Sequence, residues 1–514
     1  MSPIWLTPIR SCSRTRGYYS VHFLGISSAA SRCFSSSFRR PQRFLTLAIE
    51  TSCDDTCVAV LEKDVGAGGA AYLRFNKKIT SDNREFRGVD PMTAVASHTQ
   101  HLANLIKEAL HTLPEAQGTP TGKHERTDGN QDGAQSAKDD VLRVDGRLRR
   151  KPDFVTVTRG PGMMSNLSTG LNTAKGLAVA WDVPLLGVNH MQAHALTPRL
   201  VSALQRGEEQ RQNPGEAPTT TADEDMELAN TTEENTETPS FPFLSLLVSG
   251  GHTLLLLSRS LNHHTILAEA NSIAIGDMLD KCAREIVPPS EIAAGDSVMY
   301  GPVLERFAFP EPPGLDIDYE YTPPATRADE IELYDSGLGW GLTPPLHRTT
   351  QMAYEFAGIN GQILKLLLAR PDMPLPERRL LARHAMRLAF EHLASRLLLA
   401  LKKHLPAAAD EPSPRTLVLA GGVASNRYLV HILRSVLDAR GHGYLALVRP
   451  PASLCTDNAA MIAWTGMEMY EAGWRSELDV LAIRKWSLDP EAEGGGILGA
   501  GGWARDGVSK GEKD

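Results

Sequence analysis

The stretch Phe44-Leu-Thr-Leu-Ala-Ile-Glu-Thr-Ser-Cys-Asp-Asp-Thr-Cys-Val-Ala-Val-Leu61 contains two apolar runs on either side of a polar turn. The runs at 44–49 and 57–61 predict two buried strands. The pattern recurs at Phe243-Leu-Ser-Leu-Leu-Val-Ser-Gly-Gly-His-Thr-Leu-Leu-Leu-Leu257, where Gly-Gly separates two more apolar runs. Strand, glycine turn, strand is typical of a β-hairpin.

Strands and helices alternate after each of these hairpins. Further strands are expected at 153–158, 185–188, 416–420 and 445–448, and helices at 93–111, 166–181, from 190, 274–287, 350–370, 377–404, from 425, and 456–472. Each block therefore predicts an α/β lobe, with a ligand cleft between the two lobes. We expect an N-terminal lobe at 44–204 and a C-terminal lobe with a helical insertion at 241–489.

Length and composition exclude several classes of protein. The chain has 514 residues, 42% of them hydrophobic and 22% charged, which argues against global disorder. No apolar run reaches the roughly 18 to 20 residues that cross a bilayer, so no membrane segment is predicted. The six cysteines form no CxxC pair, which favours a reducing compartment without a disulfide framework.

Residues 1–43 have the composition of a targeting segment. They contain seven arginines and many serines, but no lysine and no acid. Mitochondrial transit peptides are Arg-rich, Ser-rich and poor in acids, whereas an ordinary disordered tail is the alternative. The segment predicts a protein of the mitochondrial matrix.

Three other stretches are expected to lie outside the folded lobes. Residues 205–240 hold ten acids and two arginines and are predicted to form a disordered acidic insertion. Residues 113–151 are predicted to form a second disordered insertion, which ends in the basic run Arg147, Arg149, Arg150 and Lys151. Residues 490–514 are expected to be a flexible tail.

Two glycine motifs are candidate anion sites. Ser249-Gly250-Gly251-His252 allows backbone N–H groups to approach an anion, and a plain hairpin turn is the alternative. Ala420-Gly-Gly-Val-Ala-Ser-Asn426 joins a strand to a helix, where a nucleotide can lie against the helix N-terminus. A turn with Ser425 as the N-cap is the alternative there.

Histidines and carboxylates offer a candidate metal site. His190 and His194 are spaced i, i+4, so on a helix both imidazoles face the same way and can share a metal. Asp457 is a candidate third ligand, although it could instead cap the helix that follows. Asp277 and Asp280 begin a predicted helix, and Asp54 and Asp55 could be turn-forming residues.

Seven motifs in order resemble the tRNA N6-adenosine threonylcarbamoyltransferase family. They are Glu50-Thr-Ser-Cys-Asp-Asp-Thr56, Gly160-Pro-Gly162, Ala174-Lys-Gly-Leu-Ala178, Asn189-His-Met-Gln-Ala-His194, Leu247-Val-Ser-Gly-Gly-His-Thr253, Gly421-Gly-Val-Ala-Ser-Asn426 and Cys455-Thr-Asp-Asn-Ala-Ala460. The likeness runs from about residue 45 to 489, and the predicted transit peptide resembles that of a mitochondrial member. It implies the two-lobed α/β fold of the actin-like ATPases (sugar kinase/Hsp70/actin) with a central cleft.

The resemblance also implies a reaction and the residues that carry it. A threonylcarbamoyl group would move from threonylcarbamoyl-adenylate to N6 of the adenosine 3′ of the anticodon in tRNAs that read ANN codons, with release of AMP. One divalent metal ion per subunit, Fe or Zn, would be held by His190, His194 and Asp457, with Asp54 and Asp55 as catalytic carboxylates. The implied substrate-binding positions are Leu247, Val248, Ser249, Gly250, Gly251, Asp280, Gly301 and Asn426. The implied partners are tRNA, a separate synthase that supplies the adenylate, and a second copy of the chain in a homodimer.

Three positions depart from the family pattern. Asp54-Asp55 stands where the family has Asp-Glu, which places any role of the longer carboxylate in doubt. Val298-Met-Tyr-Gly301-Pro302 is one glycine short, and Val89-Asp-Pro-Met92 replaces Val-Pro-Glu, with His98 or His101 as the family histidine that follows.

Charge and two rival functions complete the expectations. The formal net charge of −8 argues against a nucleic-acid partner, so tRNA contact would need local basic clusters. The candidate clusters are the run at 147–151 and Arg378, Arg379, Arg383 and Arg387. A metalloprotease is disfavoured because Met191 stands where HExxH chemistry needs glutamate. A non-catalytic nucleotide-binding chaperone or scaffold of the same fold is the other alternative.

Overall fold

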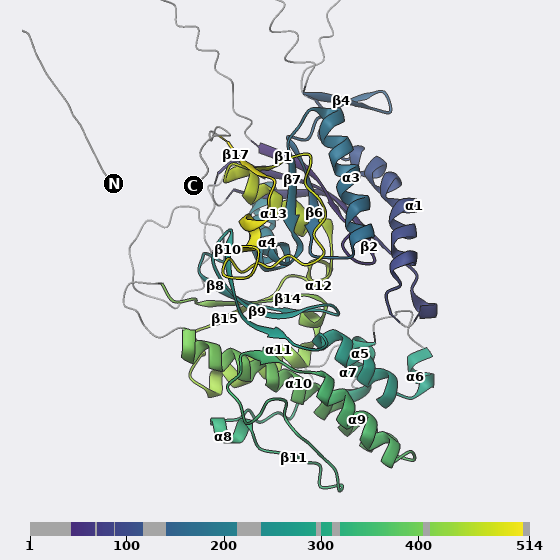
Figure 1. The fold of residues 1–514 in the computed structure, drawn as a ribbon, viewed down its shortest axis with the longest axis vertical. Coiled ribbons are helices and arrows are strands. Elements are labelled where there is room, and N and C mark those ends of the chain that lie inside the picture. The colour runs from purple at the N-terminus through teal and green to yellow at the C-terminus, as the bar shows by residue number, and fades with distance from the viewer. Residues whose placement is uncertain are drawn as a thin grey trace, which may run out of the picture. The chain divides into compact units, whose positions relative to one another are not determined.

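The computed structural model describes residues 43–66, 69–86, 88–116, 140–212, 238–293, 300–310, 319–404 and 412–506. The predicted transit peptide lies outside these residues except for Arg43, which begins the first strand. The described residues build two large mixed β-sheets, each with helices on both faces, and two small two-stranded sheets (Figure 1).

The first sheet has seven strands in the order β17-β16-β7-β6-β1-β2-β3. Its strands are β1 (Arg43–Glu50), β2 (Asp55–Asp64), β3 (Ala71–Thr80), β6 (Phe154–Gly160), β7 (Leu185–Asn189), β16 (Trp474–Ser476) and β17 (Trp503–Arg505). β1 pairs antiparallel with β2 and parallel with β6, so the predicted opening hairpin is present.

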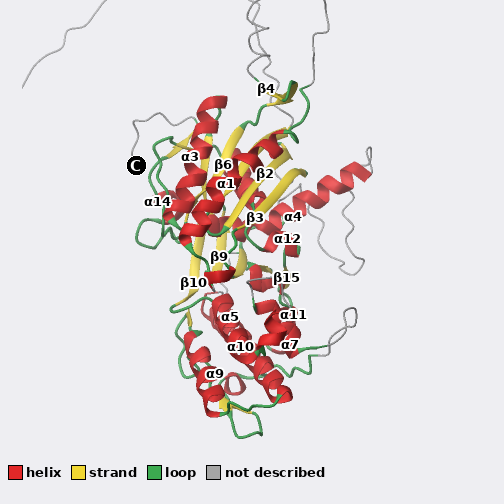
Figure 2. Ribbon diagram, turned by 90° about the vertical axis from the view of Figure 1, so that its right-hand side faces the viewer, coloured by secondary structure: helices red, strands yellow, loops and turns green. Residues whose placement is uncertain are grey.

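The alternation of side chains along β1 sends its residues to two different cores. Leu45, Leu47 and Ile49 pack with helices α1 (Pro91–Leu110) and α3 (Met164–Trp181) on the outer face. Ala48 faces the opposite core, towards α4 (His190–Gln212) and α13 (Ala459–Glu471). Figures 1 and 2 show α1 and α3 side by side on the outer face of this sheet.

The second sheet has six strands in the order β13-β10-β9-β8-β14-β15. Its strands are β8 (Phe243–Val248), β9 (Thr253–Ser260), β10 (His263–Ala270), β13 (Ala353–Tyr354), β14 (Thr416–Ala420) and β15 (Ala446–Val448). Its outer face packs on α5 (Ile275–Ile286), α7 (Gly301–Ala308), α9 (Ala357–Ala369), α10 (Leu375–His404) and α11 (Arg427–Ala439). These helices lie together at the end of the molecule opposite α1 and α3 in both ribbon views (Figures 1 and 2).

Helices α4 and α13 form the layer between the two sheets. They share one core with Ala48 of the first sheet and with Phe243 and Val418 of the second. A buried ion pair between Arg199 Nε and Glu468 Oε1, 2.8 Å apart, joins the two helices. This arrangement confirms the predicted two-lobed, actin-like α/β architecture, and any residue at the start of α4 or α13 is held between the lobes.

The predicted boundary of the first insertion is wrong at its C-terminal end. β4 (Val141–Val144) and β5 (Arg147–Arg150) form an antiparallel hairpin, whose turn residues Asp145 and Gly146 have φ angles of 43° and 82°. Asp-Gly is a turn signal for such hairpins, because both residues tolerate positive φ. Residues 117–139 lie outside the described residues.

The predicted start of the acidic insertion and the predicted flexible tail also differ from the structure. α4 continues to Gln212, so the acidic insertion starts later than residue 205, and residues 213–237 lie outside the described part of the chain. The predicted tail contains α14 (Gly496–Gly499) and β17, and β17 pairs with β16. Because β16 and β17 belong to the first sheet, the chain returns to the N-terminal lobe after residue 458. The predicted C-terminal lobe at 241–489 is therefore wrong at its C-terminal end.

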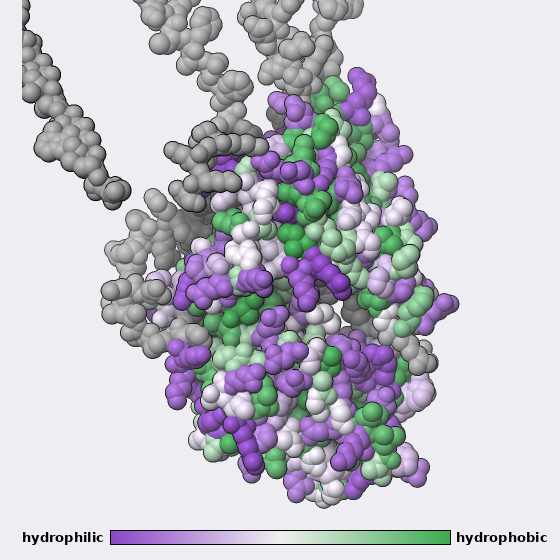
Figure 3. Space-filling view, in the orientation of Figure 1, coloured by the Kyte–Doolittle hydropathy of each residue, from purple (hydrophilic) through white to green (hydrophobic). Residues whose placement is uncertain are grey.

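Polar and apolar side chains are interspersed on the face shown in Figure 3, where the apolar ones form separate patches. None of the helices among the described residues has the length and apolar character of a membrane span. The remaining short elements are η1 (Arg84–Phe86), α6 (Pro289–Ala293), α8 (Arg327–Glu330), β11 (Tyr334–Asp335), β12 (Gly341–Leu342), η2 (Gly422–Ser425) and α12 (Ala452–Cys455).

Candidate metal centre and nucleotide cleft

Two asparagine caps place the predicted metal ligands at helix starts. The Asn189 Oδ1 at the end of β7 accepts from the N–H groups of Met191 and Gln192, so α4 begins at His190. Asn458 Oδ1 accepts from Met461 N and caps α13, which leaves Asp457 unused as a cap. The alternative role of Asp457 as the helix cap is therefore wrong.

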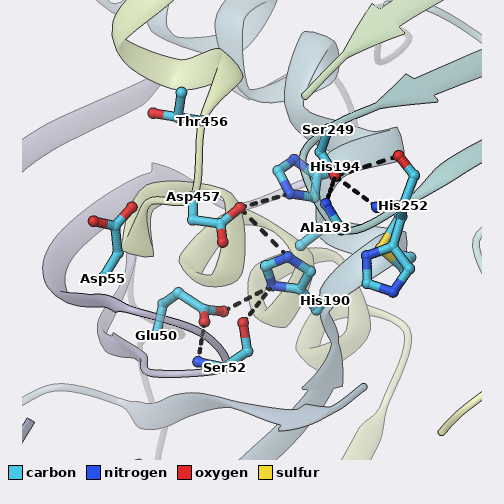
Figure 4. Close-up of polar contacts among 12 residues, drawn as sticks. Glu50, Ser52, Asp55, His190, Ala193, His194, Ser249, His252, Thr456 and Asp457 are labelled. Atoms are coloured by element: carbon cyan, nitrogen blue, oxygen red, sulfur yellow. Dashed lines mark hydrogen bonds and ion pairs between the residues drawn. The ribbon is translucent and has the colours of Figure 1, made fainter. Parts of the chain in front are cut away.

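The structure brings His190, His194 and Asp457 together. One ligand atom from each lies within 4.8 Å of the other two. Asp457 Oδ1 is 3.0 Å from His194 Nε2 and 3.5 Å from His190 Nε2 (Figure 4). The two histidines on one turn of α4 and the aspartate in the loop before α13 thus lie close together, as the sequence predicted.

Glu50 is a functional candidate that the sequence reasoning missed. Its Oε2 lies 3.0 Å from His190 Nδ1, on the side of the ring opposite Asp457 (Figure 4). The same carboxylate accepts hydrogen bonds from Ser52 N and Thr158 Oγ1, and Glu50 is 1% exposed. A glutamate at the end of a buried strand, in a motif shared with the family, was the available signal.

The charges in this cluster depend strongly on one another. Burial alone would lower the pKa of His190, but the carboxylates of Asp457 and Glu50 outweigh it and raise that pKa well above its ordinary value. Burial would likewise raise the pKa of Asp457, but His190 and His194 hold it well below the usual range. Without a metal ion, the ring of His190 is therefore a cation between two carboxylates.

The donor set fits a divalent transition metal. Two imidazole nitrogens and one carboxylate oxygen are ligands that Zn or Fe accepts in proteins. A carboxylate on the far nitrogen of a ligating histidine is the usual support for such a ligand, and Glu50 occupies that position. The described residues thus hold one possible metal site with a supporting carboxylate.

Asp54 and Asp55 have different surroundings. Asp55 Oδ2 forms an ion pair with Lys78 Nζ at 2.9 Å, and Oδ1 accepts from Thr80 Oγ1. Burial, and then the charge of Asp55, raise the pKa of the half-buried Asp54 carboxyl above its ordinary value. The Asp55 carboxylate therefore already has a cation and a hydroxyl as partners, whereas the Asp54 carboxyl keeps its proton to a higher pH than an ordinary aspartate.

His98 holds the turn that carries these aspartates. Its Nδ1 lies 2.8 Å from Thr56 Oγ1 and its Nε2 lies 3.0 Å from Cys53 O. Burial lowers the pKa of His98, so its ring is neutral and one nitrogen can accept while the other donates. Of the two histidines that the family comparison left open, His98 is the one with contacts to this turn.

The β8–β9 turn has the geometry of a tight hairpin. Ser249 N donates to His252 O at 2.9 Å, and Ser249 Oγ accepts from His252 N. The N-terminus of α5 approaches this turn closely, because a Cβ on Gly276 would lie 2.7 Å from Ser249 O. Gly250 and Gly251 are exposed, while Leu247 and Val248 are buried, so the two glycines are the accessible residues at the tip of this turn.

His252 is a third histidine near the metal cluster that was not predicted as a site residue. Figure 4 shows it on the β8–β9 turn beside His190 and His194. Burial, followed by the charge of His190, lowers the pKa of His252 to about 4, so it is neutral near pH 7.

The remaining predicted substrate positions lie on α5, α7 and α11. Asp280 Oδ1 accepts from Tyr300 N at 2.9 Å and Gly301 N at 2.7 Å, so the structure brings Asp280 and Gly301 together. Asn426 is 7% exposed and caps α11 through Leu429 N. The N-cap is therefore Asn426 rather than Ser425.

The start of α11 does not offer a free anion site. Glu305 Oε1 accepts from the N–H groups of Arg427 and Tyr428, and Asn426 takes the next one. Because a carboxylate from α7 is paired with these N–H groups, the contacts argue against a nucleotide phosphate at this helix N-terminus. Sequence reasoning missed Glu305, for which no local signal exists.

The two basic clusters are largely engaged within the protein. Arg378 donates to the carbonyl groups of Glu285 and Ile286, and Arg383 donates to that of Ala308. On the hairpin, the Arg150 guanidinium pairs with Asp153 at 2.7 Å and Lys151 donates to Trp181 O. Arg147 is exposed on the same hairpin.

Similarity to known proteins covers nearly all of these elements. A family model described as tRNA N6-adenosine threonylcarbamoyltransferase matches residues 142–221 and 225–464. The mitochondrial tRNA N6-adenosine threonylcarbamoyltransferase of Schizosaccharomyces pombe is 30% identical over 92% of this chain and 92% of its own length. The tRNA N6-adenosine threonylcarbamoyltransferase of Cereibacter sphaeroides is 31% identical over 90% of this chain and 98% of its own. With its two-lobed fold and its seven motifs, the chain belongs to the tRNA N6-adenosine threonylcarbamoyltransferase family.

Proposed function

We propose that this chain transfers a threonylcarbamoyl group from threonylcarbamoyl-adenylate to N6 of the adenosine 3′ of the anticodon, in mitochondrial tRNAs that read ANN codons. The observation that carries the proposal is the convergence of His190, His194 and Asp457 between the two lobes. Family membership supplies the reaction class, and the Arg-rich, acid-free start of the chain supports import into the mitochondrial matrix.

His190, His194 and Asp457 would hold one divalent ion, Fe or Zn. Such an ion, when bound, supplies Lewis-acid polarisation of a carbonyl oxygen. The backbone of Leu247, Val248, Ser249, Gly250 and Gly251 would contact the adenylate, because the two exposed glycines leave its phosphate room to approach. Asp280 and Gly301, on helices α5 and α7 of the same lobe as the β8–β9 turn, would bind the nucleoside part together with Asn426 at the start of α11.

The chain's own carboxylates would manage the proton. The N6 amine of the adenosine attacks the carbamoyl carbon, the bond from that carbon to the phosphate oxygen breaks, and AMP leaves with the bonding electrons. Asp54, whose pKa burial and Asp55 raise, would accept the proton that N6 loses. Asp55 would act beside it as the second carboxylate of the turn.

The direct test uses purified protein, unmodified tRNA and threonylcarbamoyl-adenylate. The proposal expects threonylcarbamoyladenosine in the tRNA and one AMP per transfer, both measured by mass spectrometry. An Asp457→Ala variant should keep its circular-dichroism spectrum and lose both products. If stoichiometric wild-type enzyme forms no product, the chain is a nucleotide-binding scaffold of this fold.

Partners follow from the same chemistry. The adenylate is a reactive mixed anhydride, so a separate synthase would have to supply it close to the site of transfer. We propose a homodimer as the working form, which sedimentation of the purified protein would test at micromolar concentration. Nucleoside analysis of mitochondrial tRNA from cells that lack this chain would test the compartment.

A further inference from the structure

Lys78 is a cation beside the metal centre that neither the motifs nor the family resemblance assigned. It lies on β3 opposite Cys57 of β2, and its side chain extends towards the loop between α12 and α13. Its Nζ donates to Thr456 Oγ1 at 3.1 Å and to Asp457 O at 3.4 Å. The side chain is 34% exposed, so the lysine reaches the loop from the surface.

Asp55 fixes the position of this cation. Its Oδ2 lies 2.9 Å from Lys78 Nζ, and the Asp55 side chain is only 8% exposed. Thr80, its partner in the β2–β3 pairing, donates to the other carboxylate oxygen. Figure 4 shows Asp55 and Thr456 on the side of Asp457 that faces away from the two histidines.

The loop needs such a support because Asp457 lies in a short connection. Only three residues separate Cys455, the last of α12, from Ala459, the first of α13. The side-chain Nδ2 of Asn458 donates a hydrogen bond to the carbonyl of Thr456 at 2.8 Å. The carbonyl of Asp457 contacts only the first sheet among the described residues, through Lys78 and, at 3.8 Å, the thiol of Cys57.

We propose that the Lys78–Asp55 pair is a latch that positions Asp457 for metal binding. The latch rests on the proposed metal centre and adds a positioning role to the one proposed above for Asp55. The Asp55 side chain reaches Lys78 while remaining paired with Thr80.

The test measures metal affinity of the full-length protein without any substrate. Zn²⁺ binding is measured by chelator competition, and Co²⁺ is used as a spectroscopic probe of the ligand set. Lys78→Met should weaken Zn²⁺ binding about 10- to 100-fold, the usual effect of removing a group that orients a ligand, and should alter the Co²⁺ absorption bands. Lys78→Arg, which keeps the charge, should recover most of the affinity.

Lys77 provides the matched control. It neighbours Lys78 on β3 but pairs with Glu108 of α1 at 2.8 Å, on the other face of the sheet. Lys77→Met should bind Zn²⁺ like the wild type. Binding by Lys78→Met within twofold of wild type, or equal losses in Lys78→Met and Lys78→Arg, would overturn the latch.

A double-mutant cycle tests whether the two residues act as one unit. Asp55→Asn and Lys78→Met should each weaken binding, and the double variant should bind no worse than the weaker single variant. Strictly additive losses would contradict the latch. Asp457→Ala distinguishes the two hypotheses: if that variant retains Zn²⁺, the proposed metal centre itself fails, whereas loss there with normal binding in Lys78→Met rejects only the latch.

Discussion

Glu50 shows how a buried carboxylate at the end of β1 can orient a metal ligand that lies 140 positions later in the chain. It accepts from His190 Nδ1 and is held by Ser52 N and Thr158 Oγ1, so it cannot turn away from the ring. This leaves His190 Nε2 directed at Asp457. The orientation of the first histidine thus depends on β1 as well as on α4.

Removing the charge of Glu50 should weaken metal binding. Glu50→Gln is expected to lower Zn²⁺ affinity about 10- to 100-fold, because the amide is a weaker acceptor for the ring N–H than the carboxylate. Chelator competition on the purified protein measures this loss. Glu108→Gln, in the exposed pair with Lys77, is the control and should bind normally. Normal affinity in Glu50→Gln would show that the contact is incidental.

Asp54 should determine the acid limb of the pH–rate profile. A general base works when deprotonated, so activity falls as the pH drops through its pKa. Burial and the charge of Asp55 raise that pKa above the ordinary carboxyl value of 3.8, which moves the loss to higher pH. We expect kcat/KM to begin to fall at a pH above the range in which carboxyl groups usually titrate. Asp54→Asn should lose most of the activity and should no longer show this acid limb. An unchanged profile in Asp54→Asn would assign the limb to another group.

At the scale of elements, long periodic segments were predictable and strands with few apolar residues were not. The helices expected at 93–111, 166–181 and 274–287 are α1, α3 and α5, with boundaries that differ by two residues at most. β3 and β10 went unpredicted, because their polar, half-exposed sequences have no apolar run. Such strands form because a neighbour supplies hydrogen bonds, and a single sequence does not show that neighbour.

Only the part of the metal site that follows from local sequence spacing could be predicted. His190 and His194 share a helix face, so their i, i+4 spacing contains the geometry. Glu305 and Lys78 approach from other elements, 122 and 379 positions from their backbone partners Arg427 and Asp457. Only the fold brings such pairs together, and that is why the occupied α11 terminus was not foreseen.

The glycine that follows β14 should be required for the fold. Gly421 has φ 95°, and a Cβ there would lie 2.4 Å from Val248 O. Gly421→Ala combines backbone strain with a clash against main chain, and we expect a loss of about 3 kcal/mol in the free energy of unfolding. Urea denaturation measures this loss. Gly176→Ala, mid-helix in α3 with open space around it, should instead be neutral or stabilise by up to about 1 kcal/mol.

At the scale of the whole molecule, the C-terminal segment comes back to the first sheet and adds its edge strand β17. Ile497 is 1% exposed, and Trp503 Nε1 donates to Ile497 O at 3.0 Å. A chain that stops at residue 494 loses β17 and this buried cluster, so its melting temperature should fall clearly below that of the full chain. A chain that stops at Asp506 keeps every contact described and is the control. Equal melting temperatures for all three chains would mean that the return contributes no stability.

Buried neutral histidines should make the second lobe sensitive to acid. Burial lowers the pKa of His264 to about 4, and burial together with Arg396 and Arg327 lowers that of His392 to about 3. The Nε2 of His392 accepts from Glu355 N at 3.1 Å, so protonation would break that hydrogen bond. In the unfolded chain these rings titrate near an ordinary pKa of about 6.5.

The sign of the effect follows from proton binding. Between about pH 6.5 and 4 the unfolded chain binds protons that the folded protein does not, so stability falls as the pH falls. His392→Gln retains an acceptor for Glu355 N but cannot titrate, and its melting temperature should therefore decline less steeply across this window than that of wild type. His263→Gln, at an exposed position of β10, should follow the wild-type slope. Because the metal centre is the same in all three proteins, its own titration cancels from the comparison, and a His392→Gln slope equal to wild type would show that His392 does not contribute to the acid sensitivity.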